Sequence, residues 1–323
     1  MKTTRKHAKS QPKPRSNVKP DDATATKANS LVISSVSLAI AVACYGVTSI
    51  GNIAHAGPEN GVVVSGNGSI SKTAAQTLIQ QNSQNMAINW DSYNVASGER
   101  VQYIQPNSQS VSLNRILSSD GSRIAGNIDA NGKVILVNPN GILFTQTATL
   151  NVGSLVASSL NITPDNFING NYVFDAIENV NGAVINHGII NASVGGNGGG
   201  SVTLLGKQVE NHGLISANLG AVNLAVGKQA VLTFEADGLL GVRVTDEVLQ
   251  SELGVDPALV NSGEISAKGG RVLLTASVSQ DVFSNAVNSG IEHASSVVVH
   301  KDGSFTLGGG ADVLNTGTID VST

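Results

Sequence analysis

The chain has 323 residues, of which 41% are apolar, 3% aromatic and 13% charged, and it contains 36 glycines. Disorder is excluded because apolar residues are plentiful and charge is sparse, and glycine turns with few aromatics favour a β architecture over a compact enzyme. The net charge of −4 is uneven: residues 1–56 hold eight Lys/Arg against two Asp, so residues 57–323 carry about −10. Such a body lacks the clustered Lys and Arg that nucleic-acid binding requires.

The N-terminus has the pattern of an export signal. Residues 1–30 are basic and polar, residues 31–50 form an apolar run, and Ala54-His55-Ala56 gives the small-x-small pattern that precedes cleavage. We predict a signal peptide over residues 1–56 with a long basic n-region, cleaved between Ala56 and Gly57. Two alternatives are a retained transmembrane anchor, since about 20 apolar residues reach the lower range of a spanning helix, and lipidation at Cys44. Cys44 is the only cysteine, so the exported part cannot form disulfides.

A tight turn lies between two apolar runs in the middle of the chain. Residues 134–137 and 142–144 are β-formers bounded by turn residues, as buried strands are. The residues between them restrict the backbone, because Pro fixes φ while Asn and Gly tolerate positive φ. The segment of interest is Asn138, Pro139, Asn140, Gly141 and Ile142. No catalytic residue type lies in or beside it.

This turn and its surroundings resemble the secretion domain of two-partner secretion exoproteins, typified by the filamentous haemagglutinins of Gram-negative bacteria. Residues 131–144 resemble the family's Asn-Gly-x-Val-x-Leu-x-Asn-Pro-Asn-Gly core, and residues 165–174, 237–240 and 269–276 resemble later landmarks. The similarity covers roughly residues 60–320. Some members carry a second Asn-Pro-Asn motif upstream, whereas this chain has Gln105-Pro106-Asn107-Ser108. Any role of that upstream site is therefore in doubt.

The resemblance implies a secreted or cell-surface protein, exported through the periplasm with the help of an outer-membrane β-barrel transporter. Residues 138–142 would then help the transporter recognise the chain, or they would serve only the fold. An adhesin or haemagglutinin role is implied, with toxin or cytolysin roles as family alternatives and a host-cell or carbohydrate receptor as a further partner. We expect these activities mostly beyond residue 323, and the chain to be either a fragment of a longer exoprotein or a truncated open reading frame.

From residue 180 onward the sequence is periodic. An Asn-x-Gly unit begins at Asn186, Asn211, Asn261, Asn288 and Asn315. One spacing of 50 among spacings of 25 to 27 indicates a degenerate unit or an insertion near residues 236–256. Strand-like runs at 201–205, 221–225, 271–274 and 304–307 lie between the units. Such periods indicate stacked coils, and short strands without helical patterns between them indicate a β-solenoid.

We therefore predict an all-β fold, a right-handed parallel β-helix with an N-terminal cap over residues 57–110 and coils over about 111–323. Equivalent Asn residues would hydrogen-bond along the stack, and the following Gly would supply positive φ. Two small extra-helical insertions are expected. Residues 163–166 read as a helix start with Pro at N1, and residues 245–250 as a second helix start with acids in the first turn.

Nothing in the sequence assembles an enzyme site. A polysaccharide-active β-helix enzyme, the main alternative, needs paired carboxylates around a groove, and a surface-retained structural protein is a further alternative. The acidic candidates Asp91, Asp120, Asp129, Asp165 and Asp175 share no repeat position. Residues 195–200 are glycine-rich but lack the Lys-Ser/Thr of a phosphate loop. We expect no catalysis and no cofactor.

Two pairs of residues allow other interpretations. His187 and His212 occupy equivalent repeat positions, but no third metal ligand recurs there, so we expect polar turn positions and no metal. Trp90 and Tyr93 could form a carbohydrate platform, but buried aromatic anchors in the cap are favoured.

Overall fold

The computed structural model describes residues 57–234, 240–246, 257–276, 294–299, 305–309 and 313–323. The expected signal peptide up to Ala56 and the repeat residue Asn288 lie outside these ranges. Among the described residues, no helix combines the length and apolarity that a membrane span needs.

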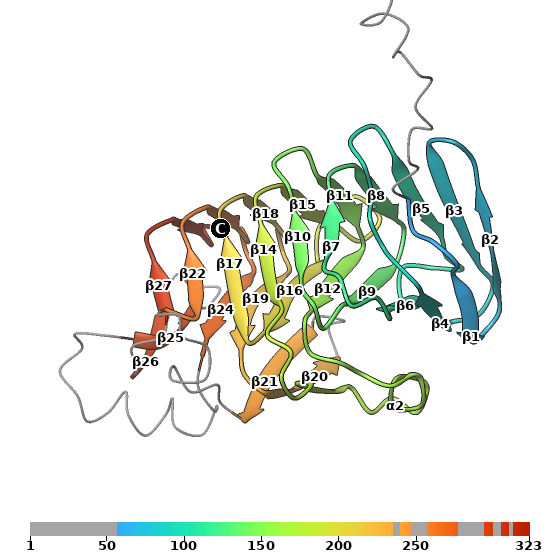
Figure 1. The fold of residues 1–323 in the computed structure, drawn as a ribbon. Coiled ribbons are helices and arrows are strands. Elements are labelled where there is room, and N and C mark those ends of the chain that lie inside the picture. The colour runs from blue at the N-terminus through green and yellow to red at the C-terminus, as the bar shows by residue number, and fades with distance from the viewer. Residues whose placement is uncertain (1–56, 235–239, 247–256, 277–293, 300–304, 310–312) are drawn as a thin grey trace, which may run out of the picture. The chain divides into compact units, whose positions relative to one another are not determined.

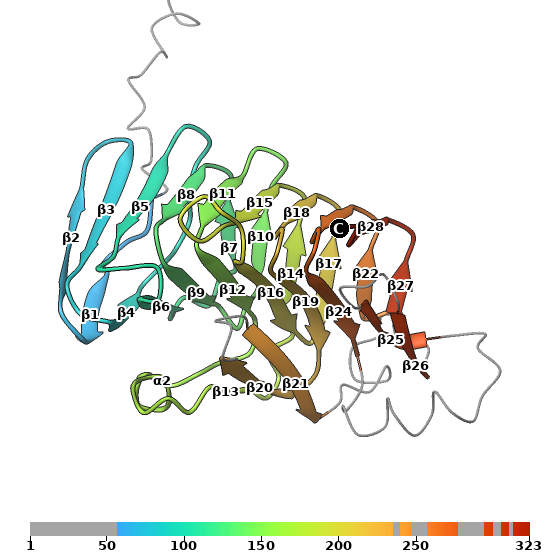
Figure 2. The same cartoon turned by 180° about the vertical axis from the view of Figure 1, so that it is seen from behind.

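Three sheets form the walls of a parallel β-helix (Figures 1 and 2). The ten-stranded sheet contains β1 (Val62–Ser65), β4 (Asn85–Trp90), β6 (Val111–Ile116), β9 (Lys133–Val137), β12 (Ser154–Ser158), β16 (Ser201–Gly206), β19 (Ala221–Val226), β24 (Arg271–Thr275), β25 (Ala294–Val299) and β26 (Phe305–Gly309), in that order. The nine-stranded sheet contains β2 (Gly68–Lys72), β3 (Gln76–Gln81), β5 (Arg100–Ile104), β8 (Asn127–Ala130), β11 (Thr149–Val152), β15 (Ile189–Ala192), β18 (Leu214–Ser216), β23 (Glu264–Ser266) and β28 (Thr318–Asp320). The six-stranded sheet contains β27 (Val313–Asn315), β22 (Leu259–Asn261), β17 (Gln208–Asn211), β14 (Ala183–Asn186), β10 (Ile142–Phe144) and β7 (Ser122–Ile124).

From β7 to β24, successive coils each place one strand in each of the three sheets. β10, β11 and β12 form one coil, and they pair in parallel with β14, β15 and β16 of the next coil. Because a coil pairs its backbone only with the coils before and after it, the stack is built from nearest-neighbour interfaces. The predicted parallel β-helix is therefore confirmed.

Two apolar cores lie on opposite faces of the ten-stranded sheet. Along β9, Val134 and Leu136 belong to the core inside the coils, whereas Ile135 and Val137 belong to a second core outside them. This double burial explains why residues 134–137 are a continuous apolar run instead of alternating with polar residues. The second core is covered by an extra-helical layer that includes the buried Phe167.

That layer consists of one short helix and a small antiparallel sheet. Helix α2 (Pro164–Ile168) begins at the N-cap Thr163, whose side chain accepts from the backbone N–H of Asn166, with Pro in the first turn. The sheet contains β13 (Val173–Asp175), β20 (Gln229–Phe234) and β21 (Leu240–Asp246), and Figure 1 shows it beside the coils. The helix predicted at residues 163–166 is confirmed.

The second predicted helix start, at residues 245–250, lies mostly outside the described residues. Thr245 and Asp246 are the last residues of β21, which pairs antiparallel with β20, and residues 247–250 lie outside the described part. β-Branched Val242 and Val244 suit the strand, which places Thr245 and Asp246 in β21, and a helix after Asp246 stays a prediction.

Both ends of the ten-stranded sheet change to antiparallel pairing. β1 pairs antiparallel with β4, and β2 pairs antiparallel with β3. Parallel pairing already begins with β3 and β5 and with β4 and β6. Because β3, β4 and β5 lie inside the expected 57–110 cap, the antiparallel part of that segment ends at Lys72. At the other end β25 pairs antiparallel with β24 and β26, and the run at 304–307 therefore does not continue the parallel stack.

Candidate functional site

The Asn138–Ile142 turn forms a corner between β9 and β10. The side chain of Asn138 is fully buried. Its Nδ2 donates to the carbonyl oxygen of Asp120 and to Oγ of Ser122, both at 3.0 Å, and its Oδ1 accepts from the backbone N–H of Asn140 at 3.0 Å. One side chain thus shapes its own turn and fastens it to the preceding coil.

The other residues of the corner extend this packing to both neighbouring coils. Asn140 Nδ2 donates to the carbonyl oxygen of Ser118 in the preceding coil at 2.8 Å. Gly141 has a φ of +104°, and a Cβ at this position would lie 2.8 Å from the carbonyl oxygen of Ala183 in the next coil. Only glycine combines this backbone conformation with such a close approach.

The folded chain hides the motif from partners. Asn138, Pro139, Gly141 and Ile142 are buried, and Asn140 is half-buried. Side chains that bond to the neighbouring coil cannot also bond to another protein unless that coil moves. A partner that reads these residues must therefore meet them before the corner forms.

The upstream site has its own structural role. Gln105, the first residue of the upstream Gln-Pro-Asn-Ser segment, is buried, and its Oε1 accepts from the N–H of Gly132 at 2.9 Å. Its Nε2 lies within hydrogen-bond distance of Gln81 Oε1, the Ser110 carbonyl and the Lys133 carbonyl. Gln105 therefore links three coils, a role that the sequence did not indicate because the motif is incomplete.

A ladder of asparagines, of which Asn186, Asn211 and Asn261 are buried, runs along the six-stranded sheet. Asn186 Nδ2 donates to Asn211 Oδ1 at 2.8 Å, Asn211 to Asn261 at 2.8 Å, and Asn261 to Asn315 at 2.6 Å. Asn261 and Asn315 are paired directly in β22 and β27, which leaves no strand between them for a coil centred on Asn288. The spacings of 50 and 54 residues arise because one coil includes β20 and β21 and the next includes β25 and β26.

The glycines of the Asn-x-Gly units do not have the predicted positive φ. None of Gly188, Gly213, Gly263 and Gly317 is in the left-handed region. Instead, a Cβ on Gly213 would overlap the carbonyl oxygen of Gly188, and a Cβ on Gly263 or Gly317 would overlap that of the glycine one coil earlier. Glycine is required here because the stacked turns approach so closely.

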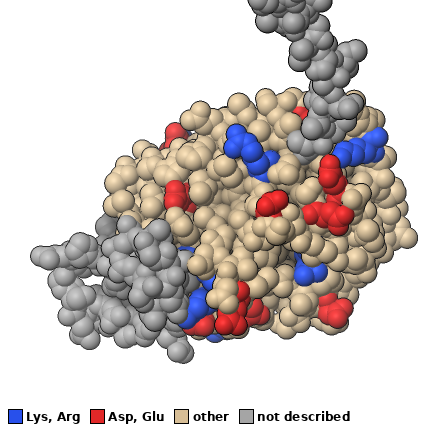
Figure 3. Space-filling model, in the orientation of Figure 1, with Lys and Arg blue, Asp and Glu red and all other residues tan. Residues whose placement is uncertain are grey.

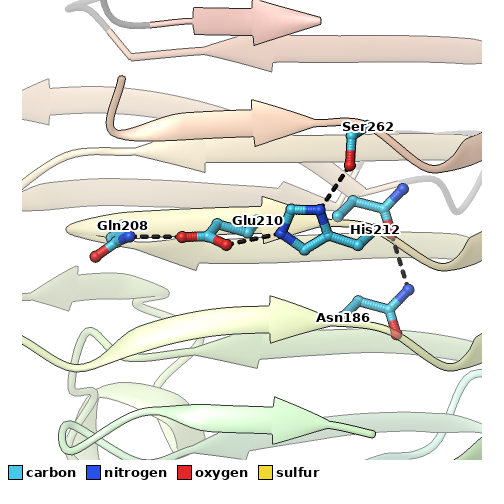
Figure 4. A network of polar contacts seen from close by, with 6 residues as sticks. Asn186, Gln208, Glu210, His212 and Ser262 are labelled. Carbon is cyan, nitrogen blue, oxygen red and sulfur yellow. Dashed lines mark hydrogen bonds and ion pairs between the residues drawn. The ribbon is translucent and has the colours of Figure 1, made fainter. Parts of the chain in front are cut away.

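The two histidines stack one coil apart. The His187 and His212 rings lie 4.9 Å apart at an interplanar angle of 15°. His212 Nδ1 lies 2.6 Å from Ser262 Oγ and Nε2 lies 2.7 Å from Glu210 Oε2, as Figure 4 shows. The described residues contain no group of three His, Cys, Asp or Glu that could hold a metal ion.

The aromatic pair is buried in the first coils. Trp90 and Tyr93 are each 1% exposed and meet edge to face, with ring centroids 5.6 Å apart. Neither can serve as a surface platform for a sugar, so the interpretation as buried anchors is correct.

The acidic candidates do not gather at one position, but a groove brings some carboxylates together. This groove, of about 460 Å³, is lined by Asp175, Glu178 and Asp246 with Lys207 and Lys228. Figure 3 shows acidic and basic side chains together at the lower edge of a largely uncharged face. Asp175 Oδ1 accepts from Gln229 Nε2 at 2.7 Å, and Asp246 lies 3.9 Å from Lys228 Nζ. The sequence missed this juxtaposition because β21 belongs to the extra-helical layer.

Known proteins are similar to this chain in sequence and in fold. Residues 54–321 match the family described as the TPS secretion domain. Two proteins named heme/hemopexin-binding protein, both from Haemophilus influenzae, are 32% identical over 222 residues and 39% identical over 103 residues. These matches cover 66% and 32% of this chain but only 24% and 11% of the relatives.

A solved structure agrees with the same assignment. The HMW1 secretion domain from Haemophilus influenzae superposes with a TM-score of 0.59 at 31% sequence identity, covering 67% of this chain and 55% of that one. The chain belongs to the family of TPS secretion domains, which are the two-partner secretion domains of exoproteins that Gram-negative bacteria export through the periplasm and secrete or display at the surface.

Proposed function

We propose that residues 57–323 are a non-enzymatic module that brings the exported chain to its outer-membrane transporter, after a signal peptide is removed between Ala56 and Gly57. The family match over residues 54–321 supports this function. The transporter's periplasmic domains and its β-barrel are the partners. Mass spectrometry of the secreted N-terminus tests the cleavage site, and a retained apolar segment would favour an anchored protein instead.

The burial of Asn138 supports a proposal about when the transporter recognises the chain. Since the corner is inaccessible once folded, the transporter reads residues 138–142 in an extended chain. An extended chain can add a strand to an exposed sheet edge in the transporter. The coils then fold outside the cell, where each coil buries its apolar faces against the one before it.

The whole exoprotein is proposed to be an adhesin or haemagglutinin. Its receptor, on a host cell or on a carbohydrate, would be bound mainly by parts outside this segment, because the matched segment is at most 24% of the relatives' length. Those relatives are named for binding heme and hemopexin. We therefore include heme and hemopexin among the proposed targets of the whole exoprotein.

Secretion with and without the transporter tests the module directly. We expect wild type to appear in the medium only when the transporter is present, and Asn138→Ala and Asn140→Ala to reduce that appearance. Asn127→Ala is the matched control, because Asn127 is exposed. Wild type that stays in the periplasm with every transporter supplied would contradict the proposal.

The carboxylates of the groove around Asp175 give the enzyme alternative its best location. The non-enzymatic assignment predicts that neutral and acidic polysaccharides keep their chain length when incubated with the purified chain. Depolymerisation that is abolished by Glu178→Gln or Asp246→Asn would overturn it.

A further inference from the structure

A second groove lies on the outer face of the six-stranded sheet, near the end formed by β7. Its volume is about 460 Å³. The lining residues are Ser97, Arg123, Ala125, Leu143, Thr145, Gln146, Thr147 and His187. None of these is acidic, in contrast to the groove beside Asp175. The volume falls within the range of small-ligand sites, and the lining combines one cation, several hydroxyl and amide groups and one large aliphatic side chain.

Arg123 is the cation of this groove and has no partner. Its side chain is exposed, and its guanidinium makes no hydrogen bond or ion pair with any described residue. Arg100, by comparison, donates through Nε to Asp129 at 2.7 Å. A guanidinium presents a planar fork of donors that matches a carboxylate bidentately. Arg123 is therefore free to bind an anionic group in the groove.

Two hydrogen-bonded threonine hydroxyls leave the oxygen of Thr145 able to accept from a ligand. Thr147 Oγ1 donates to the carbonyl oxygen of Ala125 at 2.7 Å, and Thr145 Oγ1 lies 3.1 Å from Thr147 Oγ1. Because the Thr147 proton is already used, Thr145 must be the donor of that pair. The lone pairs of Thr145 then remain available to accept from a ligand hydroxyl.

His187 is held in place on one face and free at its nitrogens. Its ring stacks on His212 at 4.9 Å. His212 is itself fixed between Glu210 and Ser262, and Glu210 accepts from Gln208 Nε2 at 2.6 Å (Figure 4). The ring nitrogens of His187 make no hydrogen bond with the described residues, so they can bond to a ligand at no cost in broken contacts.

We propose that this groove binds a saccharide that carries a carboxylate, such as a uronic acid unit of a polysaccharide. Arg123 receives the carboxylate, Thr145 and His187 bond to ring hydroxyls, and half-buried Leu143 contacts the apolar C–H face of the sugar. Exposed residues on the rim, including Gln146 and Thr147, leave the groove open at the surface. An open groove accommodates an internal unit of a polymer. This binding activity is separate from recognition by the transporter.

Calorimetric titration of the purified chain with a galacturonic acid trisaccharide tests the proposal. We expect the acid to bind and its methyl ester, which lacks the charges and carries one added methyl group on each acid, to bind about tenfold more weakly or not at all. Arg123→Gln should weaken binding of the acid by about tenfold, and Arg100→Gln, which alters a paired arginine outside the groove, should leave it unchanged. His187→Ala should cause a smaller loss.

Absence of binding by the acid, equal binding of acid and ester, or unchanged binding by Arg123→Gln would each overturn the proposal. Because Arg123 is exposed and unpaired, its substitution should leave thermal unfolding unchanged, which separates a lost site from a lost fold. Arg123→Gln should also be secreted like wild type. Failure of saccharide binding would therefore leave the transporter proposal standing.

Discussion

The corner at residues 138–142 and the ladder from Asn186 to Asn315 use the same two residue types for different physical reasons. In the corner, Asn138 bonds to backbone and hydroxyl groups of one neighbouring turn, and Gly141 is needed for its φ of +104° as well as for space. In the ladder, each Asn bonds to the equivalent Asn of the next coil, and glycine is needed only for close approach. A residue pattern therefore does not reveal which physical requirement it meets.

The corner and the ladder also differ in how many coils their hydrogen bonds connect. The corner's side-chain bonds reach the preceding turn, so its loss should act on one junction. The ladder joins four coils through one row of amides, so its members depend on each other. Substitutions can test each part of this comparison.

The largest expected effect is at a ladder glycine. Gly213→Ala places a Cβ against the carbonyl oxygen of Gly188, and we expect a loss of about 3 kcal/mol in the free energy of unfolding. Gly170→Ala is the control, since Gly170 has a φ of +73° but nothing within 4 Å of its Cβ, and it should cost about 1 kcal/mol. Urea unfolding measures both, and a loss at Gly213 no larger than the loss at Gly170 would contradict the claim that close stacking requires the ladder glycines.

Removing one amide should cost more in the ladder than in the corner. Asn211→Ala leaves donors of Asn186 and acceptors of Asn261 unpaired inside the protein, and we expect a loss of about 2–3 kcal/mol. Asn138→Ala removes a partner from the Asp120 carbonyl, the Ser122 hydroxyl and the Asn140 N–H. Asp120 is exposed and Asn140 is half-buried, so water can replace the lost partner at two of the three groups and about 1–2 kcal/mol is expected.

A double-mutant cycle distinguishes the two kinds of fastening. Asn211→Ala and Asn261→Ala should be strongly non-additive because they share a bond, whereas Asn211→Ala and Asn138→Ala should add. Additivity within the ladder would show that its amides do not act together.

The first coils show a third use of asparagine and predict a loss of stability at high pH. Asn114 Oδ1 accepts from Trp90 Nε1 and from the Tyr103 hydroxyl, both at 3.0 Å, and the Tyr93 and Tyr103 hydroxyls lie 2.7 Å apart. Burial raises the pKa of Tyr93 and of Tyr103 well above the usual value. The folded state therefore keeps protons that the unfolded state loses above about pH 10, and stability falls as pH rises beyond that value.

Urea unfolding at pH 8, 10 and 11 measures this decline. Tyr93→Phe removes one of the two titrating groups and should make the decline shallower. A decline that is as steep in the variant would assign it to other groups.

The smallest expected effect is a gain in stability. Leu219 has a φ of +57° and is 58% exposed, while Gly269 fills the equivalent turn position one coil later with a φ of +66°. Leu219→Gly should relieve strain and stabilise the chain by about 1 kcal/mol. A loss of stability in thermal unfolding would show that contacts of the leucine outweigh its backbone strain.

The sequence predicted the features that local chemistry determines. The turn at residues 138–142, the helix start at Thr163 and the stacking of Asn186, Asn211 and Asn261 follow from turn residues, capping and period. It did not predict the antiparallel pairing of β20 with β21, because Thr245 and Asp246 are equally good helix-start residues until a partner strand is present. It also predicted a coil between Asn261 and Asn315, because a period in sequence cannot show that two strands 54 residues apart pair directly.

Recognition by the transporter is proposed to occur before the corner folds. The most direct test mixes the purified periplasmic part of the transporter with the chain in two states, folded and freshly diluted from urea. We predict that only the freshly diluted chain binds and that Asn138→Ala weakens this binding, whereas Asn127→Ala does not. Equal binding of the folded chain, in which Asn138 is fully buried, would contradict the account.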